Sequence, residues 1–174
     1  MGVSFRMATT SSLAAPGLGR PVAVLRIFFG LVFLSNGLVK FLPDGFSNTP
    51  FGFLINSPGA RGIIRNDASH NGVPAYRALV EHVLIPNWEF FGPVLGASEV
   101  IAGALLCVGL LTPVAALFAA LMSAHINFAT YGHEWLFEYA VEWVPLLVLA
   151  AIRAGRYHGL DARLARNRPA SLFW

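Results

Sequence analysis

The sequence predicts an all-α membrane protein, a four-helix bundle with a long external loop between its first and second helices. Of the 174 residues, 56% are hydrophobic and only 12% are charged, about half the charge that a typical soluble domain carries. The apolar residues gather in four runs, each about as long as the ~20 residues that a helix needs to cross a bilayer. The basic residues cluster beside these runs, which is typical of membrane orientation rather than of nucleic-acid binding.

The apolar runs set the boundaries of the bundle. The first run is too long for the core of a signal peptide, and no small-residue cleavage site follows it. Only Leu111, Thr112 and Pro113 separate the second run from the third, so these two spans are expected to form a tight antiparallel hairpin. The predicted spans, flanked by a flexible tail over residues 1–20 and a basic tail over residues 155–174, cover residues 21–42, 88–110, 113–131 and 135–154.

The loop between the first two spans, residues 43–87, is rich in Gly, Pro and Asn. A short helix is expected after Pro74, over residues 76–84. Long loops in compact proteins are usually either functional or disordered. The phenylalanines of this loop favour a segment that lies on the membrane or caps the bundle: Phe46, Phe51 and Phe53.

The distribution of Arg and Lys predicts the orientation. Four spans place both termini on one side, and that side carries more basic residues than the loop does. The positive-inside rule therefore places both termini in the cytoplasm. Trp88, Tyr131 and Trp135 then meet at the outer interface, as an aromatic belt requires. Arg26, just inside the first span, is interpreted as an orientation residue that snorkels to the cytoplasmic edge.

Polar side chains inside the spans are the candidates for function, because a buried charge costs on the order of 3 kcal/mol even on lenient insertion scales. Glu99 shares a helix face with Gly92, Gly96 and Gly103, which let a neighbouring helix approach closely and turn Glu99 into the bundle. Counted from the outer interface, Lys40 is shallow and Glu99 lies near mid-membrane. We expect one pocket, open to the outside, formed by Asn36, Lys40, Glu99, His125, Asn127, Glu138 and Glu142.

Within this pocket, Glu99 and His125 are the candidate catalytic residues, since a buried acid or imidazole can accept or relay a proton. Lys40 can neutralise a carboxylate or hold an anion, and the remaining polar residues are candidates for substrate binding. His125 and Asn127 lie on opposite faces of their helix, so at most one of them points at Glu99.

Structural alternatives remain open for these residues. Lys40 and Glu99 can form an ion pair that only fixes the register of the bundle, and Glu138 can simply be solvated. His125 can be a satisfied core residue. No two His or Cys have the spacing of metal ligands, so no metal site is predicted. The single cysteine, Cys107, allows neither a disulfide nor a redox pair, so electron transfer would need a partner or a bound carrier.

Several motifs in order along the chain resemble the DoxX/DoxD family of small membrane proteins, which includes the small subunit of thiosulfate:quinone oxidoreductase. The loop from Pro74 to Pro86 is similar to the DoxD branch. The resemblance extends over residues 21–168 and rests on Leu25–Gly30, Asn36–Phe41, Glu99-x-x-x-Gly103, Gly109–Pro113 and Gly155–Asp161.

This resemblance implies a four-helix bundle with a role in a respiratory or redox-protective assembly. By position, the family's recurrent polar residues would be Arg26, Lys40, Glu99 and Asp161. One expectation is the membrane subunit of an oxidoreductase, in which thiosulfate or a similar small donor meets a quinone in the outer pocket. The alternative is a non-catalytic scaffold that anchors partner redox enzymes through its glycine faces and basic tail. In both cases we expect the bacterial plasma membrane, contact with lipid, and a second subunit or a second copy of this chain.

Overall fold

The computed structural model describes residues 17–42, 54–132, 134–135 and 137–174. The expectations for residues 1–16 and for Phe46, Phe51 and Phe53 lie outside these ranges. The described residues are helical and contain no strand. In chain order the elements are α1 (Gly19–Val39), α2 (Ser57–His70), α3 (Pro74–Leu79), the π-helical turn η1 (Val80–Leu84), α4 (Trp88–Val108), α5 (Thr112–Ala129), α6 (Ala140–Ala151), the 3₁₀ turn η2 (Ala154–Arg156) and α7 (Asp161–Asn167).

Three of the described helices, α1, α4 and α5, are long and apolar enough to cross a membrane. The fourth predicted span, residues 135–154, is not confirmed as a span, because α6 has only 12 residues. Such a helix is about 18 Å long, short of the ~30 Å hydrocarbon core. Residues 137–139 form turns before it, and Arg153 follows it with a positive φ of 53°. The hydrophobic run is therefore longer than the helix that it forms.

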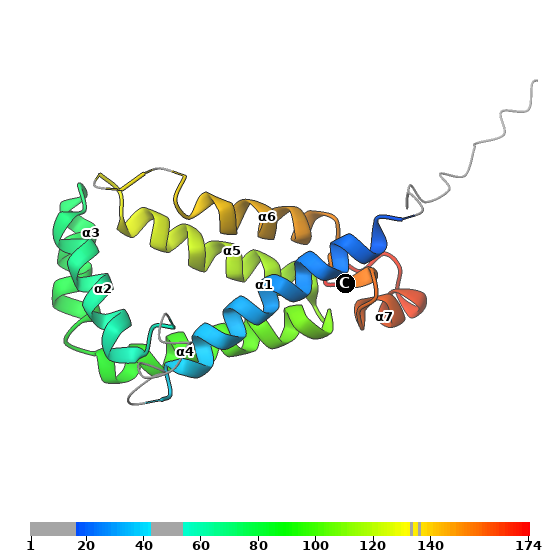
Figure 1. Ribbon diagram of the computed structural model, residues 1–174, viewed down its shortest axis with the longest axis horizontal. Coiled ribbons are helices and arrows are strands. Elements are labelled where there is room, and N and C mark those ends of the chain that lie inside the picture. The colour runs from blue at the N-terminus through cyan, green and yellow to red at the C-terminus, as the bar shows by residue number, and fades with distance from the viewer. Residues whose placement is uncertain (1–16, 43–53, 133, 136) are drawn as a thin grey trace, which may run out of the picture.

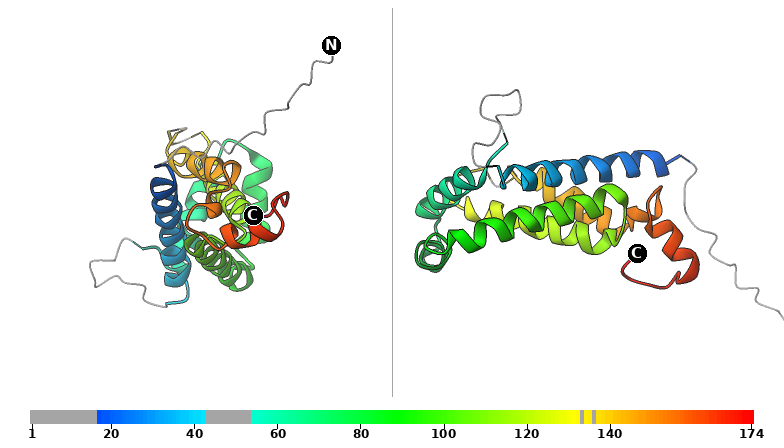
Figure 2. Two further views of the ribbon diagram at one scale, coloured as in Figure 1. Left: turned by 90° about the vertical axis from the view of Figure 1, so that its right-hand side faces the viewer. Right: turned by 90° about the horizontal axis from the view of Figure 1, so that it is seen from below.

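The apolar helices form two pairs, α1 with α4 and α5 with the shorter α6 (Figure 1). The pairs meet at the end where α7 and the C-terminus lie, and they separate toward the other end (Figures 1 and 2). There α2 and α3, which follow the first span in sequence, bridge the gap between α4 and α5. Most of the predicted loop is thus helical, including the expected helix after Pro74.

Glycines bring α1 and α4 into close contact. A Cβ on Gly37 would lie 2.6 Å from the backbone nitrogen of Val100, and one on Gly103 would overlap the backbone of Gly30 and Leu34. This is the close approach that small residues allow between membrane helices. Gly92 has a different neighbour, because its Cβ would meet Ser57 of α2.

The α5–α6 pair packs through small and aliphatic side chains. Its alanines line one side of α5 and contact buried leucines of α6, and this core continues onto α1 and α4. The fully buried members include Ala116, Ala119, Leu106, Leu146 and Leu149. One continuous core therefore joins the two pairs at the end where they converge.

Two opposite charges close that convergent end. Arg26 is 1% exposed, and its guanidinium donates to the carbonyls of Leu106 and Cys107 at the C-terminal end of α4. Asp161 is fully buried and accepts from the backbone nitrogens of Leu111 and Thr112, 2.8 and 2.9 Å away. Each charge complements the end of the helix dipole that it meets. The snorkelling interpretation of Arg26 is therefore wrong: its charge is held by backbone carbonyls inside the protein.

The segment Asn56–Ile85, which contains α2, α3 and η1, forms a roof that is fixed to both helix pairs. Asn71 is 1% exposed and donates to the carbonyls of Phe128 and Ala129 at the end of α5, at 2.6 and 2.9 Å. On the other side, Trp88 of α4 donates to the hydroxyl of Ser57 at 3.0 Å. The roof thus holds the separated ends of the bundle at a set distance.

Candidate pocket between the helix pairs

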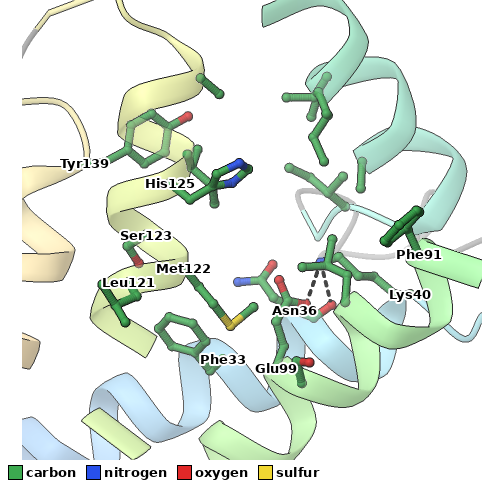
Figure 3. Close-up of a pocket in the computed structure, with 18 of the residues that line it drawn as sticks. Phe33, Asn36, Lys40, Phe91, Glu99, Leu121, Met122, Ser123, His125 and Tyr139 are labelled. Carbon is green, nitrogen blue, oxygen red and sulfur yellow. Dashed lines mark hydrogen bonds and ion pairs between the residues drawn. The ribbon is translucent and has the colours of Figure 1, made fainter. Parts of the chain in front are cut away.

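A cavity of about 600 Å³ lies between the two helix pairs beneath the roof. Its size falls in the range of small-molecule sites. Most of its wall is apolar, with Phe33, Phe91, Leu121 and Met122 among the side chains drawn in Figure 3. The few polar side chains in the wall therefore determine how a ligand would be oriented.

The first polar group joins α1 to α4. Lys40 Nζ lies 2.7 Å from Glu99 Oε2, and the two side chains are 6% and 11% exposed. Lys40 also donates to the carbonyl oxygen of Asn36 at 3.2 Å. Figure 3 shows this group at one wall of the cavity. The ion pair neutralises both charges, which is the condition under which charges are tolerated in an apolar interior.

Lys40 lies deeper than the sequence indicates. A Cβ on Gly96 would be 3.1 Å from Cβ of Lys40, so Lys40 stands beside the turn of α4 that precedes Glu99. Helix α4 begins at Trp88, about 12 Å before Gly96 at ~1.5 Å per residue. The end of α1 therefore lies beside a point about 12 Å along α4 from its start. This places Lys40, at the end of α1, next to Glu99 in the middle of α4.

A second polar group stands on the α5–α6 side. His125 and Tyr139 point toward the cavity from the wall opposite Lys40 (Figure 3). Ser123 donates to Glu142 Oε2 at 3.0 Å. Tyr76 of the roof is within hydrogen-bond distance of His125, with 3.3 Å between Oη and Nε2. Burial, together with the negative charge of Asp67, raises the pKa of Tyr76 above its usual value, so this hydroxyl keeps its proton at neutral pH.

Five of the seven predicted pocket residues line this one cavity: Asn36, Lys40, Glu99, His125 and Glu142. Asn127 and Glu138 do not line it. Asn127 lies on the other side of α5, where its Oδ1 accepts from Trp143 Nε1 at 3.3 Å, and Glu138 is exposed. The expectation that His125 and Asn127 face opposite ways is met.

Several polar or aromatic lining residues are not expected from the sequence, among them Asp67, Trp88 and Tyr139. Asp67 belongs to α2, which the sequence treats as loop, although it is only 6% exposed. Trp88 is expected at the interface and instead forms part of the wall. Tyr139 could have been predicted from the sequence, because it stands three residues before Glu142, a spacing that places two side chains on the same side of a helix. Among the described residues, no three His, Cys, Asp or Glu side chains are grouped as metal ligands would be.

Long apolar helices around a cavity with a buried ion pair are typical of a helical membrane protein. The family model of DoxX matches residues 22–132, and the chain therefore belongs to the DoxX family. The matched segment includes Arg26, Lys40, Glu99 and His125. No curated protein and no solved structure matches the chain. Family membership and the apolar helices together indicate a membrane protein.

Proposed function

We propose that this protein is the membrane subunit of a redox complex and that its cavity binds the ring of a quinone. The observation that carries the proposal is the Lys40–Glu99 pair, two charges 2.7 Å apart in the wall of an otherwise apolar cavity. A purely structural pair has no need of an adjoining cavity of about 600 Å³. An ionisable pair within membrane helices is a functional candidate by default.

Polar side chains stand on opposite walls of the cavity, an arrangement that suits a ring with a carbonyl oxygen at each end. Lys40 is the donor on one side, and His125, with Tyr139 beside it, is available on the other. Phe33 and Met122 lie in the apolar wall and can contact the face of a ring. Apolar walls with a few convergent polar groups are the usual design of such sites.

A bound quinone supplies an acceptor for two electrons and two protons. The chain's own part is to hold the ring and move protons. With a ring bound, Lys40 Nζ would donate a hydrogen bond to one ring oxygen while Glu99 balances its charge. His125 would serve the other oxygen, and Tyr76 Oη, 3.3 Å from its Nε2, would orient the imidazole. Lys40 and His125 would thus act as the positioned groups that general acid–base transfer requires.

For the electron donor we propose thiosulfate or a similar small anion. Oxidation of two thiosulfate ions to tetrathionate releases two electrons, which match the two taken up by one quinone. No cysteine pair is available, since Cys107 is the single cysteine of the chain. The electrons pass either directly to the quinone or through a partner subunit in the bacterial plasma membrane.

The experiment is to extract the protein gently into lipid nanodiscs and measure bound quinone by chromatography and mass spectrometry. We expect about one quinone per wild-type protein and little in Glu99→Gln. Glu89→Gln is the matched control, because Glu89 is an exposed acid on the same helix. Wild-type protein without quinone, or Glu99→Gln with a full complement, would count against the proposal. Quinone reduction by thiosulfate in the same nanodiscs tests the donor separately.

If the protein is instead a scaffold that binds no ligand, the expected result differs. Wild type and Glu99→Gln would both lack quinone and would both retain a partner enzyme in a constant ratio. Removal of the C-terminal segment would then release that partner. This segment is folded back on the protein, since Arg156 donates to the carbonyls of Pro169 and Trp174 at 2.9 and 2.8 Å.

A further inference from the structure

We infer that the quinone enters sideways from the bilayer, between α4 and α5, and that its isoprenoid tail lies across Val94, Phe118 and Leu121 when the ring is bound. This inference rests on the proposed function and adds the route, the tail and the residues that contact it.

The roof closes the end of the cavity that faces away from the convergent end. The roof residues Ala60, Ile64 and Leu84 form its inner surface. Hydrogen bonds fix the roof on both sides, through Asn71 to α5 and through Ser57 to α4. Arg61 adds a bond to the carbonyl oxygen of Ile85 at 3.2 Å. Entry past the roof would break these contacts, whereas entry between the helices would not.

The exposure of the cavity wall shows on which side it opens. The most exposed apolar lining residues lie on α4 and α5: Leu121 at 60%, Val94 at 45% and Phe118 at 44%. On the roof side, Ile55 and Ile63 are exposed at 40% and 41%. On the α1–α6 side, the lining residues are buried or half-buried, and none is exposed; these are Val32, Phe33, Asn36, Lys40 and Glu142. The opening therefore lies between α4 and α5.

The opening lies within the parts of α4 and α5 that are long and apolar enough to cross the hydrocarbon core. Val94 is about 9 Å from the start of α4, and Leu121 is about 12 Å from the end of α5, at ~1.5 Å per residue. Half of the hydrocarbon core is about 15 Å thick. A molecule dissolved in the bilayer reaches an apolar opening at this depth without crossing the roof.

This geometry specifies the class of ligand. The ring reaches the buried pair of Lys40 and Glu99, while an apolar chain attached to it leaves through the opening and meets Leu121 and Phe118. Such a ligand gains van der Waals contacts along its tail, which is the kind of interaction that drives packing inside a bilayer. The site thus favours a long-chain quinone over the same ring without a tail.

The test compares binding of an isoprenoid quinone with that of its tailless ring analogue, in nanodiscs, for wild type and Leu121→Trp. We expect Leu121→Trp to weaken the long-chain quinone about tenfold or more, a change worth about 1.4 kcal/mol, and to leave the tailless ring within about twofold. Ile101→Trp is the matched control, since Ile101 is also 60% exposed but lies on α4 outside the cavity lining. Phe118→Ala is a second variant that removes tail contacts without adding bulk.

The outcomes separate this inference from the proposed function. Wild type that binds neither quinone overturns the proposed function itself. Wild type that binds both, with Leu121→Trp and Phe118→Ala unchanged for the long-chain quinone, overturns the lateral route and leaves the ring site standing. Equal loss of both quinones in these variants also overturns the route, because the tail would then have no contact of its own. A selective loss of the long-chain quinone in both variants, absent from Ile101→Trp, supports it.

Discussion

Lys40 and Glu99 form an ion pair that joins the end of α1 to the middle of α4, with 2.7 Å between Nζ and Oε2. Around it, Gly37 and Gly96 bring the two helix backbones together. The pair is thus held by packing on one side and faces the cavity on the other. This position suits both a structural role and the proposed chemical role, and mutation can separate the two.

Removing either partner of this pair should destabilise the protein, because the other charge is left buried. We expect Lys40→Met or Glu99→Gln to lower the free energy of unfolding by about 3 kcal/mol. The double variant Lys40→Met/Glu99→Gln should recover most of this loss, since no charge remains buried. Unfolding in detergent, measured beside quinone binding, checks it.

Quinone binding distinguishes the two roles. All three variants should lose the bound quinone, including the double variant that regains stability. If the double variant is stable and retains its quinone, the pair is structural only, and the candidate site loses its main polar group.

The contact between α1 and α4 depends on the missing side chain of Gly103. Gly103→Ala places a methyl group against the backbone of Gly30 and Leu34, and we expect a loss of about 2 kcal/mol from overpacking. Gly62→Ala is the control, because a Cβ at Gly62 of α2 has no atom within 4 Å. That variant should be as stable as wild type or slightly more so, because alanine favours a helix. Thermal unfolding of both proteins measures the difference, and equal midpoints would contradict the packing.

Asp161 stabilises the turn between α4 and α5 by accepting from two backbone nitrogens. Asp161→Ala should cost about 2 kcal/mol, the upper end for loss of a helix N-terminal cap, while quinone binding at the far end of the bundle is retained. Arg163→Ala, at an exposed position of the same helix, should change stability by less than about 0.5 kcal/mol. Denaturation in detergent checks both values. If Asp161→Ala is as stable as wild type, water takes over the hydrogen bonds that the carboxylate accepts from Leu111 and Thr112.

The roof should weaken at alkaline pH because of Tyr76. Burial, and then the charge of Asp67, raises the pKa of Tyr76 above its ordinary value of 10.0, so the folded protein favours the neutral phenol. This contribution to stability is complete below the unfolded pKa and is lost as the pH rises through the folded pKa. Between pH about 8 and about 11, the hydrogen-exchange rate of the α3 amides should therefore increase more steeply than the intrinsic exchange rate of unprotected amides does.

Tyr76→Phe is the control for this pH effect. It removes the titrating group and also the hydrogen bond to His125. Its roof should be less stable than wild type at neutral pH and should lack the additional loss above pH about 10. The same alkaline loss in Tyr76→Phe would assign the effect to another group.

The sequence alone determined the helical membrane class, the family and the residues that carry polar chemistry. Long apolar runs predict α1, α4 and α5 because a span needs about 20 apolar residues, and each of these three helices forms within such a run. Glycine spacing predicted a close helix approach at Gly92 and Gly96. Gly96 does lie against the end of α1, as does Gly103 against its middle, whereas Gly92 meets Ser57 of α2 instead. These features depend on local composition and periodicity, which a single chain segment contains in full.

Only the tertiary structure decided which polar residues meet. Depth counted along each span assumes that all spans begin at one level, yet α1 ends beside Gly96 of α4, so Lys40 reaches Glu99. Arg26 is bound by carbonyls of α4, more than 75 positions away in sequence. The roof and the opening between α4 and α5 likewise depend on how separate helices pack. Such contacts join distant parts of the chain, and no local pattern encodes them.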